Sequence, residues 1–259
     1  GRPGAGKSAV LSSILRNMGS KGYRSMIISL EMSAEQLAER MISDTIFDFP
    51  CTNVAYSDLR TGNFHENMFQ YVQDAARMNE ELPIHIEEQP GLTMSQIATR
   101  ARRMKRSKEG LDLLAIDHLD LVKPSGRYQG NKVYELGEIT AAGKALAKEL
   151  KIPVVLLCQL NRAVETREDK RPMLADLRSS GSIEQDADAV IFLYRPSYYL
   201  ENSKPKDDTP EHLKWVEDCA DAKNKLFAII AKQRMGPTGP VELFCDIASN
   251  AVRDLGDNR

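Results

Sequence analysis

Hydrophobic and polar positions follow two different patterns along this chain. In some segments apolar residues recur every three or four positions, which is typical of helices that bury one face. One such segment opens with Ser33 followed three residues later by Gln36, a capping-box pair that marks a helix start. Helices are therefore expected at 7–18, 33–47, 62–82, 93–108, 132–151 and 213–222.

Short runs of consecutive apolar residues lie between these helical segments, as expected for strands that are buried on both faces. Strands that alternate with helices build a mainly parallel sheet with helices on both faces, which is an α/β fold. Consecutive strands near the end of the chain predict an antiparallel edge. The expected strands are 24–31, 83–88, 111–117, 152–160, 187–195, 226–233, 240–247 and 250–256.

One segment, at about 202–223, does not fit this alternation. It starts with charged residues and prolines and becomes helical near Leu213, so we interpret it as a surface insertion. The 259 residues suit one large α/β domain or two small ones, and we interpret residues 1–259 as one. The longest apolar run, VVLLC, is too short to cross a bilayer, and no membrane partner is expected.

Charge and cysteine content narrow the function only slightly. A net charge of −2 means that contact with nucleic acid has to come from a local patch. The helix at 93–108 is rich in Arg and Lys but has no aromatic residue for base stacking, so we favour a solvated helix face over a DNA site. Four scattered cysteines without a C-x-x-C pair are typical of reduced thiols in the cytoplasm.

The strongest chemical signal is the opening stretch GRPGAGKS, which fits the phosphate-loop pattern G-x-x-x-x-G-K-[ST]. Backbone N–H groups of such a loop, and of the helix that follows it, bind phosphate oxygens. Lys7 would reach the β- and γ-phosphates, and the Ser8 hydroxyl would bind Mg²⁺. The nucleotide-binding residues expected here are Gly1, Gly4, Ala5, Gly6, Lys7, Ser8 and Ala9.

Polar side chains end several of the expected strands, and the carboxyl ends of parallel strands meet at one edge of a sheet. Asp117 is expected to accept a hydrogen bond from a Mg²⁺-bound water, with Asp120 as a weaker competitor beyond the strand end. Glu31 could activate the attacking water, or could only favour a helix N-terminus. Gln159 could sense the γ-phosphate, or could be an ordinary polar residue after a strand.

Two further segments carry cations that have no role within this strand-end cluster. Lys232 and Arg234 follow a strand and point the same way, so in a ring of subunits they could reach a neighbour's γ-phosphate. An exposed basic hairpin tip is the alternative. Arg178 and Gly181 lie in the polar stretch DLRSSGS, which could hold a DNA phosphate or be only a flexible loop before a helix start near Ser182.

Taken together, several segments resemble the C-terminal motor domain of the bacterial replicative DNA helicases, the DnaB-like family. They are GRPGAGKS, SLEMSAEQLAERM, LLAIDHLDL, RPMLADLRSSGSIEQDADAVIFLYR and AKQRMGPTGPVEL, and the resemblance covers nearly the whole chain. It implies a RecA-like P-loop NTPase core that uses ATP and Mg²⁺. It also implies 5′→3′ translocation on single-stranded DNA by a homo-hexameric ring in the cytoplasm. A primase and a helicase loader would be partners of the full-length protein.

The same resemblance implies roles for individual residues. Glu31 would be catalytic, Ser8 and Asp117 would hold Mg²⁺, and Gln159 would sense the γ-phosphate. Arg40 would line the nucleotide site. The other catalytic residues would be Lys7, Lys232 and Arg234, the last two acting on a neighbour's ATP, and the DNA-binding residues would be Arg178, Ser179 and Gly181.

The chain also departs from the family pattern. Ser179 stands where glutamate is usual, and His118 stands where an aromatic residue such as tyrosine is usual. The N-terminal collar domain, the linker helix and the first core strand are expected to be absent, so residues 1–259 should bind ATP weakly and form hexamers poorly. The alternative functions are a RecA-type recombinase or repair ATPase, and a non-catalytic nucleotide-binding fragment.

Overall fold

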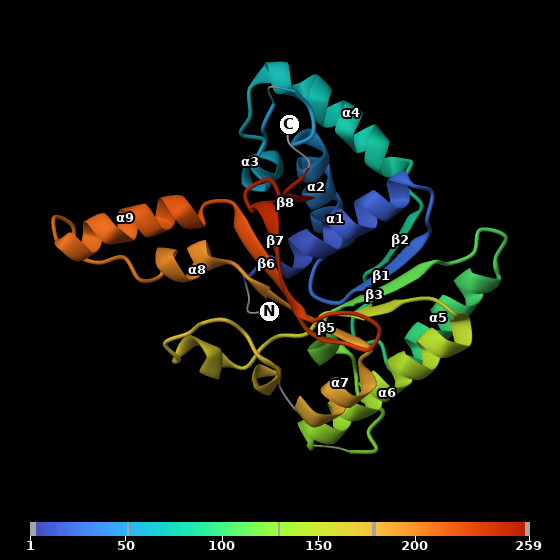
Figure 1. Cartoon of the computed structure of the whole chain (residues 1–259). Coiled ribbons are helices and arrows are strands. Elements are labelled where there is room, and N and C mark those ends of the chain that lie inside the picture. The colour runs from blue at the N-terminus through green and yellow to red at the C-terminus, as the bar shows by residue number, and fades with distance from the viewer. Residues whose placement is uncertain (1–3, 51, 129, 178–179, 257–259) are drawn as a thin grey trace.

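The computed structural model describes residues 4–50, 52–128, 130–177 and 180–256, which form two sheets with helices around them (Figure 1). The helices are α1 (Lys7–Ser20), α2 (Ala34–Ile46), α3 (Tyr56–Thr61), α4 (Phe69–Glu80), α5 (Met94–Arg106), α6 (Lys132–Leu150), α7 (Ser180–Asp186), α8 (Pro196–Glu201) and α9 (Pro210–Ala222). The strands are β1 (Ser25–Ser29), β2 (Ile84–Glu87), β3 (Leu113–Asp117), β4 (Val154–Leu156), β5 (Ala189–Tyr194), β6 (Lys225–Gln233), β7 (Gly239–Asp246) and β8 (Ala251–Asp254). No helix in the described ranges is both long enough and apolar enough to cross a bilayer.

The first sheet is parallel throughout, and its strand order is β2-β1-β3-β4. Its central strands β1 and β3 are buried along their whole length, as their unbroken apolar runs predict. Their side chains alternate between the faces: Met26 and Ile28 join one hydrophobic cluster, and Ile27 joins another. Helices α5 and α6 cover the first face, and α1 and α2 cover the second. The predicted parallel sheet between two layers of helices is confirmed.

The second sheet is antiparallel, with the strand order β5-β6-β7-β8. Antiparallel strands at this end of the chain were expected, but as an edge of the first sheet. Within the described residues no strand pairing joins the two sheets. They nevertheless share one hydrophobic cluster, to which β4 contributes Val154 and Leu156 and β5 contributes Val190 and Phe192. The sheets therefore have a common core without a common hydrogen-bond ladder.

Helix starts follow local capping chemistry. Ser33 and Gln36 form the predicted capping box at the start of α2. Thr93 and Gln96 form a second capping box at the start of α5, whose apolar side packs into the core. Helices α3 and α8 were not expected from the pattern, because segments of six residues are too short to show a helical repeat.

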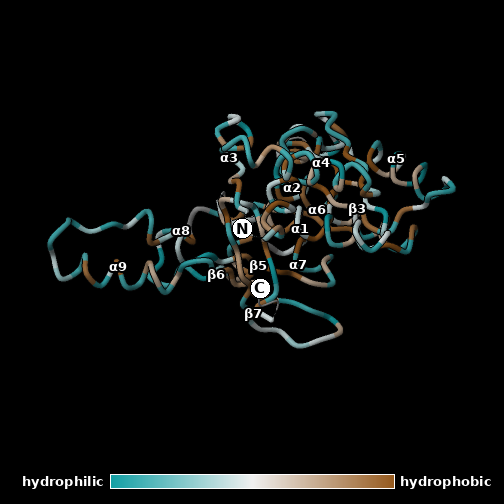
Figure 2. Tube along the Cα trace, turned by 90° about the horizontal axis from the view of Figure 1, so that it is seen from above, coloured by the Kyte–Doolittle hydropathy of each residue, from teal (hydrophilic) through white to brown (hydrophobic). Residues whose placement is uncertain are grey.

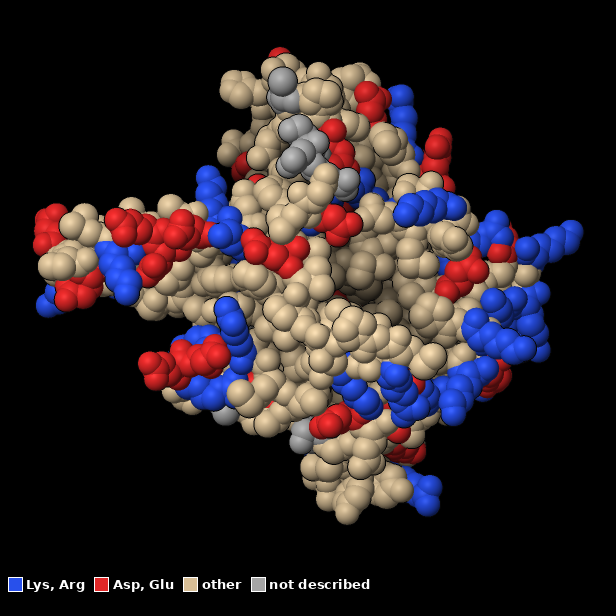
Figure 3. Space-filling model, in the orientation of Figure 1, with Lys and Arg blue, Asp and Glu red and all other residues tan. Residues whose placement is uncertain are grey.

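Helices α8 and α9 project from the body of the molecule (Figures 1 and 2), and we call residues 196–222 the arm. The arm contains most of the segment interpreted as a surface insertion. Trp215 Nε1 donates a hydrogen bond to the Leu200 carbonyl oxygen at 2.8 Å, which fastens α9 to α8. Acidic side chains are prominent on the arm in Figure 3, whereas basic side chains gather over α5 on the opposite side of the view.

Candidate active site

The phosphate loop leads directly into α1. Gly4 and Gly6 have φ values of +76° and +89°, a left-handed backbone that glycine adopts without strain. The helix begins at Lys7, and the Val10 N–H donates to the Gly6 carbonyl oxygen at 2.9 Å. The first N–H groups of a helix have no acceptor within the helix, so this end of α1 is suited to bind an anion.

Two alanines of the predicted nucleotide-binding set are buried. Ala5 is 5% exposed and Ala9 is 1% exposed. The Ala9 side chain packs against Leu226 and Cys245, so it anchors the start of α1 on the second sheet. Any contribution of these alanines to nucleotide binding therefore comes from their backbone. Gly1, which belongs to the same predicted set, lies outside the described residues.

Asp117 ends β3 beside the start of α1. The Ser8 hydroxyl donates a hydrogen bond to Asp117 Oδ2 at 3.4 Å. Burial raises the pKa of Asp117, the nearby Glu31 carboxylate raises it further, and the charges of His118 and Lys7 oppose that shift. A hydroxyl and a carboxylate are hard oxygen ligands, so this pair fits a Mg²⁺ ion that is held mainly by phosphates.

His118 draws the other strand-end side chains together. The residue is buried, and its Nε2 lies 3.4 Å from Glu31 Oε2 and 3.3 Å from Gln159 Nε2. Its Nδ1 lies 3.5 Å from Asp120 Oδ2. Glu31 and Gln159 thus contact one imidazole ring, whose residue directly follows Asp117. All three side chains lie at or just beyond the ends of neighbouring parallel strands, as the strand-end argument predicted.

The central place of His118 was not predicted from the sequence. The sequence marked it only as a departure from the family pattern, directly after Asp117. That adjacency was the available signal, because the residue after a strand end lies at the same sheet edge as the ends of the neighbouring strands. The Asp120 carboxylate lies next to Nδ1, the other ring nitrogen of His118. Asp117, and not Asp120, is the carboxylate that contacts Ser8.

Arg40 is placed near the loop by the turn between β7 and β8. Its Nη1 donates to Asn250 Oδ1 at 2.7 Å, and its guanidinium carbon lies 4.4 Å from the centre of the Tyr56 ring. Ile247, in the same turn, reaches the phosphate loop: a Cβ added to Gly6 would lie 3.8 Å from Ile247 Cδ1. No sequence signal singled out Tyr56, Ile247 or Asn250, since the Arg40–Asn250 contact joins residues 210 positions apart.

Lys232 and Arg234 lie at the end of β6 against the end of α7. Lys232 Nζ donates to the carbonyl oxygens of Glu184 and, at 2.7 Å, of Ala187. Arg234 Nε lies 3.4 Å from Asp188 Oδ1. Both cations therefore contact the same segment, which follows the stretch expected to bind DNA. Their action on a neighbouring subunit stays a prediction.

The residues expected to bind DNA fall around the start of α7. Arg178 and Ser179 lie outside the described residues. Helix α7 begins at Ser180, two residues before the start expected near Ser182, so Gly181 belongs to its first turn and not to the loop. A glycine is tolerated there because few helical hydrogen bonds depend on the first turn. A Cβ added to Gly181 would meet nothing within 4 Å, so the position is open to a ligand.

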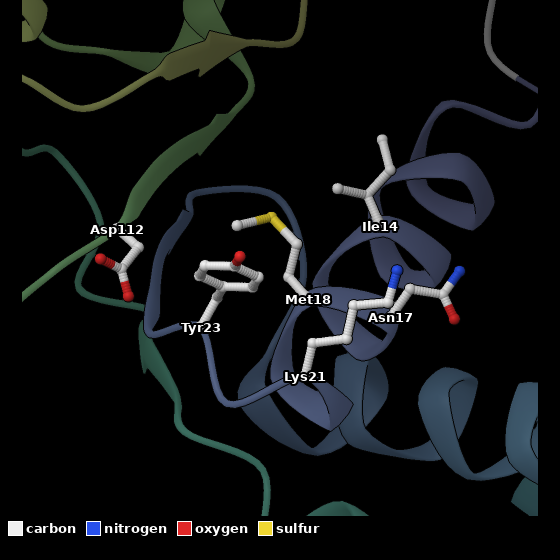
Figure 4. A pocket seen from close by; sticks show the side chains of 6 residues that line it. All are labelled: Ile14, Asn17, Met18, Lys21, Tyr23 and Asp112. Atoms are coloured by element: carbon white, nitrogen blue, oxygen red, sulfur yellow. The ribbon is translucent and has the colours of Figure 1, made fainter.

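Two hollows in the surface lie outside this cluster. One, of about 520 Å³, lies at the end of α1 far from the loop, where the side chains of Met18 and Tyr23 lie next to each other (Figure 4). The other, of about 950 Å³, lies between the arm and the segment 165–171, and Tyr198 of the arm lines it. Neither hollow contains a residue that was predicted to be catalytic.

Curated relatives match almost the whole chain. The replicative DNA helicase DnaB of Rickettsia typhi is 43% identical over 257 residues, which cover 95% of this chain and 50% of that protein. The replicative DNA helicase DnaC of Bacillus subtilis is 42% identical over 245 residues, which cover 93% of this chain and 48% of that protein. The chain therefore spans about half the length of these relatives.

Solved structures agree with this comparison. One of them, described as an ATPase domain, superposes with a TM-score of 0.83 and 30% identity, covering 98% of this chain and 82% of that one. A DnaB-like replicative helicase, described with its interactions with primase, gives a TM-score of 0.83 and 30% identity over 98% of this chain and 56% of that one. The expected RecA-like ATPase fold is thereby confirmed. The family model of the DnaB-like helicase C-terminal domain matches residues 1–252, and the chain belongs to that family.

Proposed function

We propose that this chain is the ATP-driven motor of a replicative DNA helicase, which translocates 5′→3′ on single-stranded DNA as a homo-hexameric ring. The observation that carries the proposal is the convergence of Ser8, Asp117, Glu31 and Gln159 at one sheet edge beside the phosphate loop. Membership of the DnaB-like family supports the same activity. Since the chain spans about half of its relatives, the activity of the whole protein is part of the proposal.

Each residue of the cluster has a defined task in this proposal. Bound Mg²⁺–ATP supplies the phosphoryl group that is transferred to water. Backbone N–H groups of the loop and Lys7 would bind the phosphates, and Ser8 and Asp117 would hold the metal. Glu31 would orient the attacking water and accept its proton. Its side chain is 55% exposed, and its Oε2 lies 3.4 Å from His118 Nε2, so the carboxylate is both accessible and positioned.

Coupling to DNA is proposed to begin at Gln159, which lies in the segment that follows β4. An amide beside His118 can donate a hydrogen bond to the γ-phosphate and lose it after hydrolysis. We propose that this change alters the grip of Arg178, Ser179 and Gly181 on DNA phosphates. Because phosphate contacts dominate such binding, affinity should fall with salt and depend little on base sequence.

The remaining parts of the proposal concern assembly and location. We propose that Lys232 and Arg234 act on the ATP of the neighbouring subunit, which requires the ring. A primase and a helicase loader are the proposed partners of the whole protein. One of the similar solved helicases is described with primase, and this supports the first of these partners. A replicative role places the protein in the cytoplasm.

The first prediction concerns Glu31. We expect Glu31→Gln to lower ATP turnover by at least about 100-fold, because a neutral amide cannot accept the proton of the attacking water. ATP binding should stay close to that of the unaltered protein. Phosphate release and equilibrium ATP binding measure the two effects. Glu35→Gln, an exposed change in the first turn of α2, is the matched control, and unchanged turnover in Glu31→Gln would remove Glu31 from the catalytic site.

A further inference from the structure

Arg195 is a buried cation that is held by the backbone of the phosphate loop. The residue lies between β5 and α8 and is 8% exposed. Its Nη2 donates to the Gly4 carbonyl oxygen at 3.3 Å, and its Nη1 donates to Ser197 Oγ at 3.1 Å. The carboxylate beside it, Glu201, is 3.5 Å away and 59% exposed. Hydrogen bonds and this carboxylate offset the cost of burying the cation, and one of its acceptors belongs to the phosphate loop.

Tyr198 closes the same face of the loop. A Cβ added to Gly4 would lie 3.0 Å from Cε2 of the Tyr198 ring, which is tighter than nine in ten real Cβ contacts. The Arg195 guanidinium carbon lies 5.8 Å from the centre of this ring, so ring and cation form one unit. A residue with a side chain is therefore disfavoured at position 4 for two reasons: the backbone is left-handed, and an aromatic ring packs on Gly4.

The geometry of the peptide bond carries the effect of Arg195 across the loop. The Gly4–Ala5 peptide is planar, and the C=O and N–H of a trans peptide point in opposite directions. With Arg195 on the Gly4 carbonyl, the Ala5 N–H points away from Arg195. A cation on the carbonyl also polarises the peptide, which makes this N–H a stronger donor. In a phosphate loop, backbone N–H groups are the groups that hold phosphate oxygens.

We propose that Arg195 and Tyr198 are positioning residues for nucleotide phosphates, acting through the Gly4–Ala5 peptide without touching the nucleotide. This inference rests on the proposed function in so far as the loop binds ATP. In this proposal the base of the arm helps to position the phosphate loop, because α8 carries Tyr198 and Trp215 of α9 hydrogen-bonds to α8. The contact joins residues 191 positions apart, so the sequence pattern could not indicate it.

The test is equilibrium binding of ATP and ADP to variants of the complete natural protein. Arg195→Gln removes the charge and should weaken binding of both nucleotides about tenfold, because the Ala5 N–H is then neither oriented nor polarised by a cation on the Gly4 carbonyl. Arg195→Lys should weaken binding less. Tyr198→Ala should weaken binding, whereas Tyr198→Phe, which keeps the ring, should bind as the unaltered protein does. Arg171→Gln is the control, since Arg171 is exposed and lines the hollow beside the arm.

A second readout separates positioning from a purely structural role. The KM for ATP should rise about tenfold in Arg195→Gln while kcat changes little, and the melting temperature without nucleotide should stay close to that of Arg171→Gln. Unchanged nucleotide affinity in Arg195→Gln and Tyr198→Ala would overturn the inference. Binding of ATP without DNA unwinding by the unaltered protein would overturn the proposed helicase activity alone. Failure of the unaltered protein to bind nucleotide would overturn both.

Discussion

At the scale of single residues, the candidate active site contains a buried carboxyl group, Asp117, that destabilises the fold when it is ionised. Asp117 is 4% exposed, and its pKa is raised, chiefly by burial. A carboxyl whose pKa is higher in the folded than in the unfolded state contributes stability below its unfolded-state pKa. That contribution is lost as the pH rises through the folded-state pKa. At neutral pH the ionised Asp117 therefore costs stability, as expected for a group kept to bind a cation.

This cost predicts the behaviour of Asp117→Asn. We expect the variant without nucleotide to melt at a higher temperature than the unaltered protein at pH 7, because a neutral amide is cheaper to bury than a carboxylate. The difference should shrink as the pH falls toward the carboxyl range, where Asp117 becomes protonated. Thermal unfolding across that pH range measures it. A variant that melts lower at pH 7 would show that the ionised carboxylate stabilises the fold.

At the scale of elements, a buried ion cluster ties three of them together. Asp44 on α2 has a fully buried side chain, 3.0 Å from Arg16 of α1 and 2.7 Å from Arg253 of β8. The same two arginines also reach Asp48, whose side chain is 35% exposed. These contacts join the two sheets through the helices between them and keep α1, which carries the loop, in place.

We expect Asp44→Ala to lower the free energy of unfolding by about 3–5 kcal/mol, because it leaves two half-buried arginines without their fully buried partner. Asp48→Ala removes a partly exposed partner of the same arginines and should cost about 1 kcal/mol or less. Urea unfolding of both variants provides the comparison. Equal losses in the two variants would contradict the central role given to Asp44.

The sequence pattern predicted helices and strands well where the residues of the element itself indicate its type. The capping box of α2 and the unbroken apolar runs of β1 and β3 are local, and the structure has them where the pattern indicated. The pattern also predicted that the side chains of Glu31, Asp117 and Gln159 lie close together, since parallel strands bring their carboxyl ends to one sheet edge. The contacts of Arg195 with Gly4 depend on packing between distant segments, and no local signal exists for them.

The sequence pattern also could not predict that the strands form two separate sheets. Hydrophobic runs predict strands but not which strands pair, so β6, β7 and β8 were expected to form an antiparallel edge of the parallel sheet. Among the described residues β4 pairs only with β3, and β5 pairs only with β6. A strand between β4 and β5 would join the sheets. That such a strand precedes the loop in the natural protein, with a collar domain and a linker helix before it, stays a prediction.

At the scale of the whole molecule, the proposed ring has subunits that complete one another's ATP sites. Subunits with Arg234→Ala keep Glu31, and subunits with Glu31→Gln keep Arg234. If Arg234 acts on the neighbour's ATP, each variant alone should be inactive, and a random mixture should regain hydrolysis at about one interface in four. Phosphate release after mixing and reassembly measures the gain. Activity of Arg234→Ala alone, or a mixture as inactive as its components, would contradict action between subunits.

In the proposed function, ATP hydrolysis at this cluster moves the protein along single-stranded DNA and separates a duplex. The most direct measurement is strand displacement by the complete natural protein on a forked duplex with a 5′ or a 3′ single-stranded tail. We predict that displacement requires ATP, Mg²⁺ and the 5′ tail. We also predict that Glu31→Gln abolishes displacement. Displacement from the 3′ tail, or pairing of complementary strands without any displacement, as a recombinase would produce, would contradict the account.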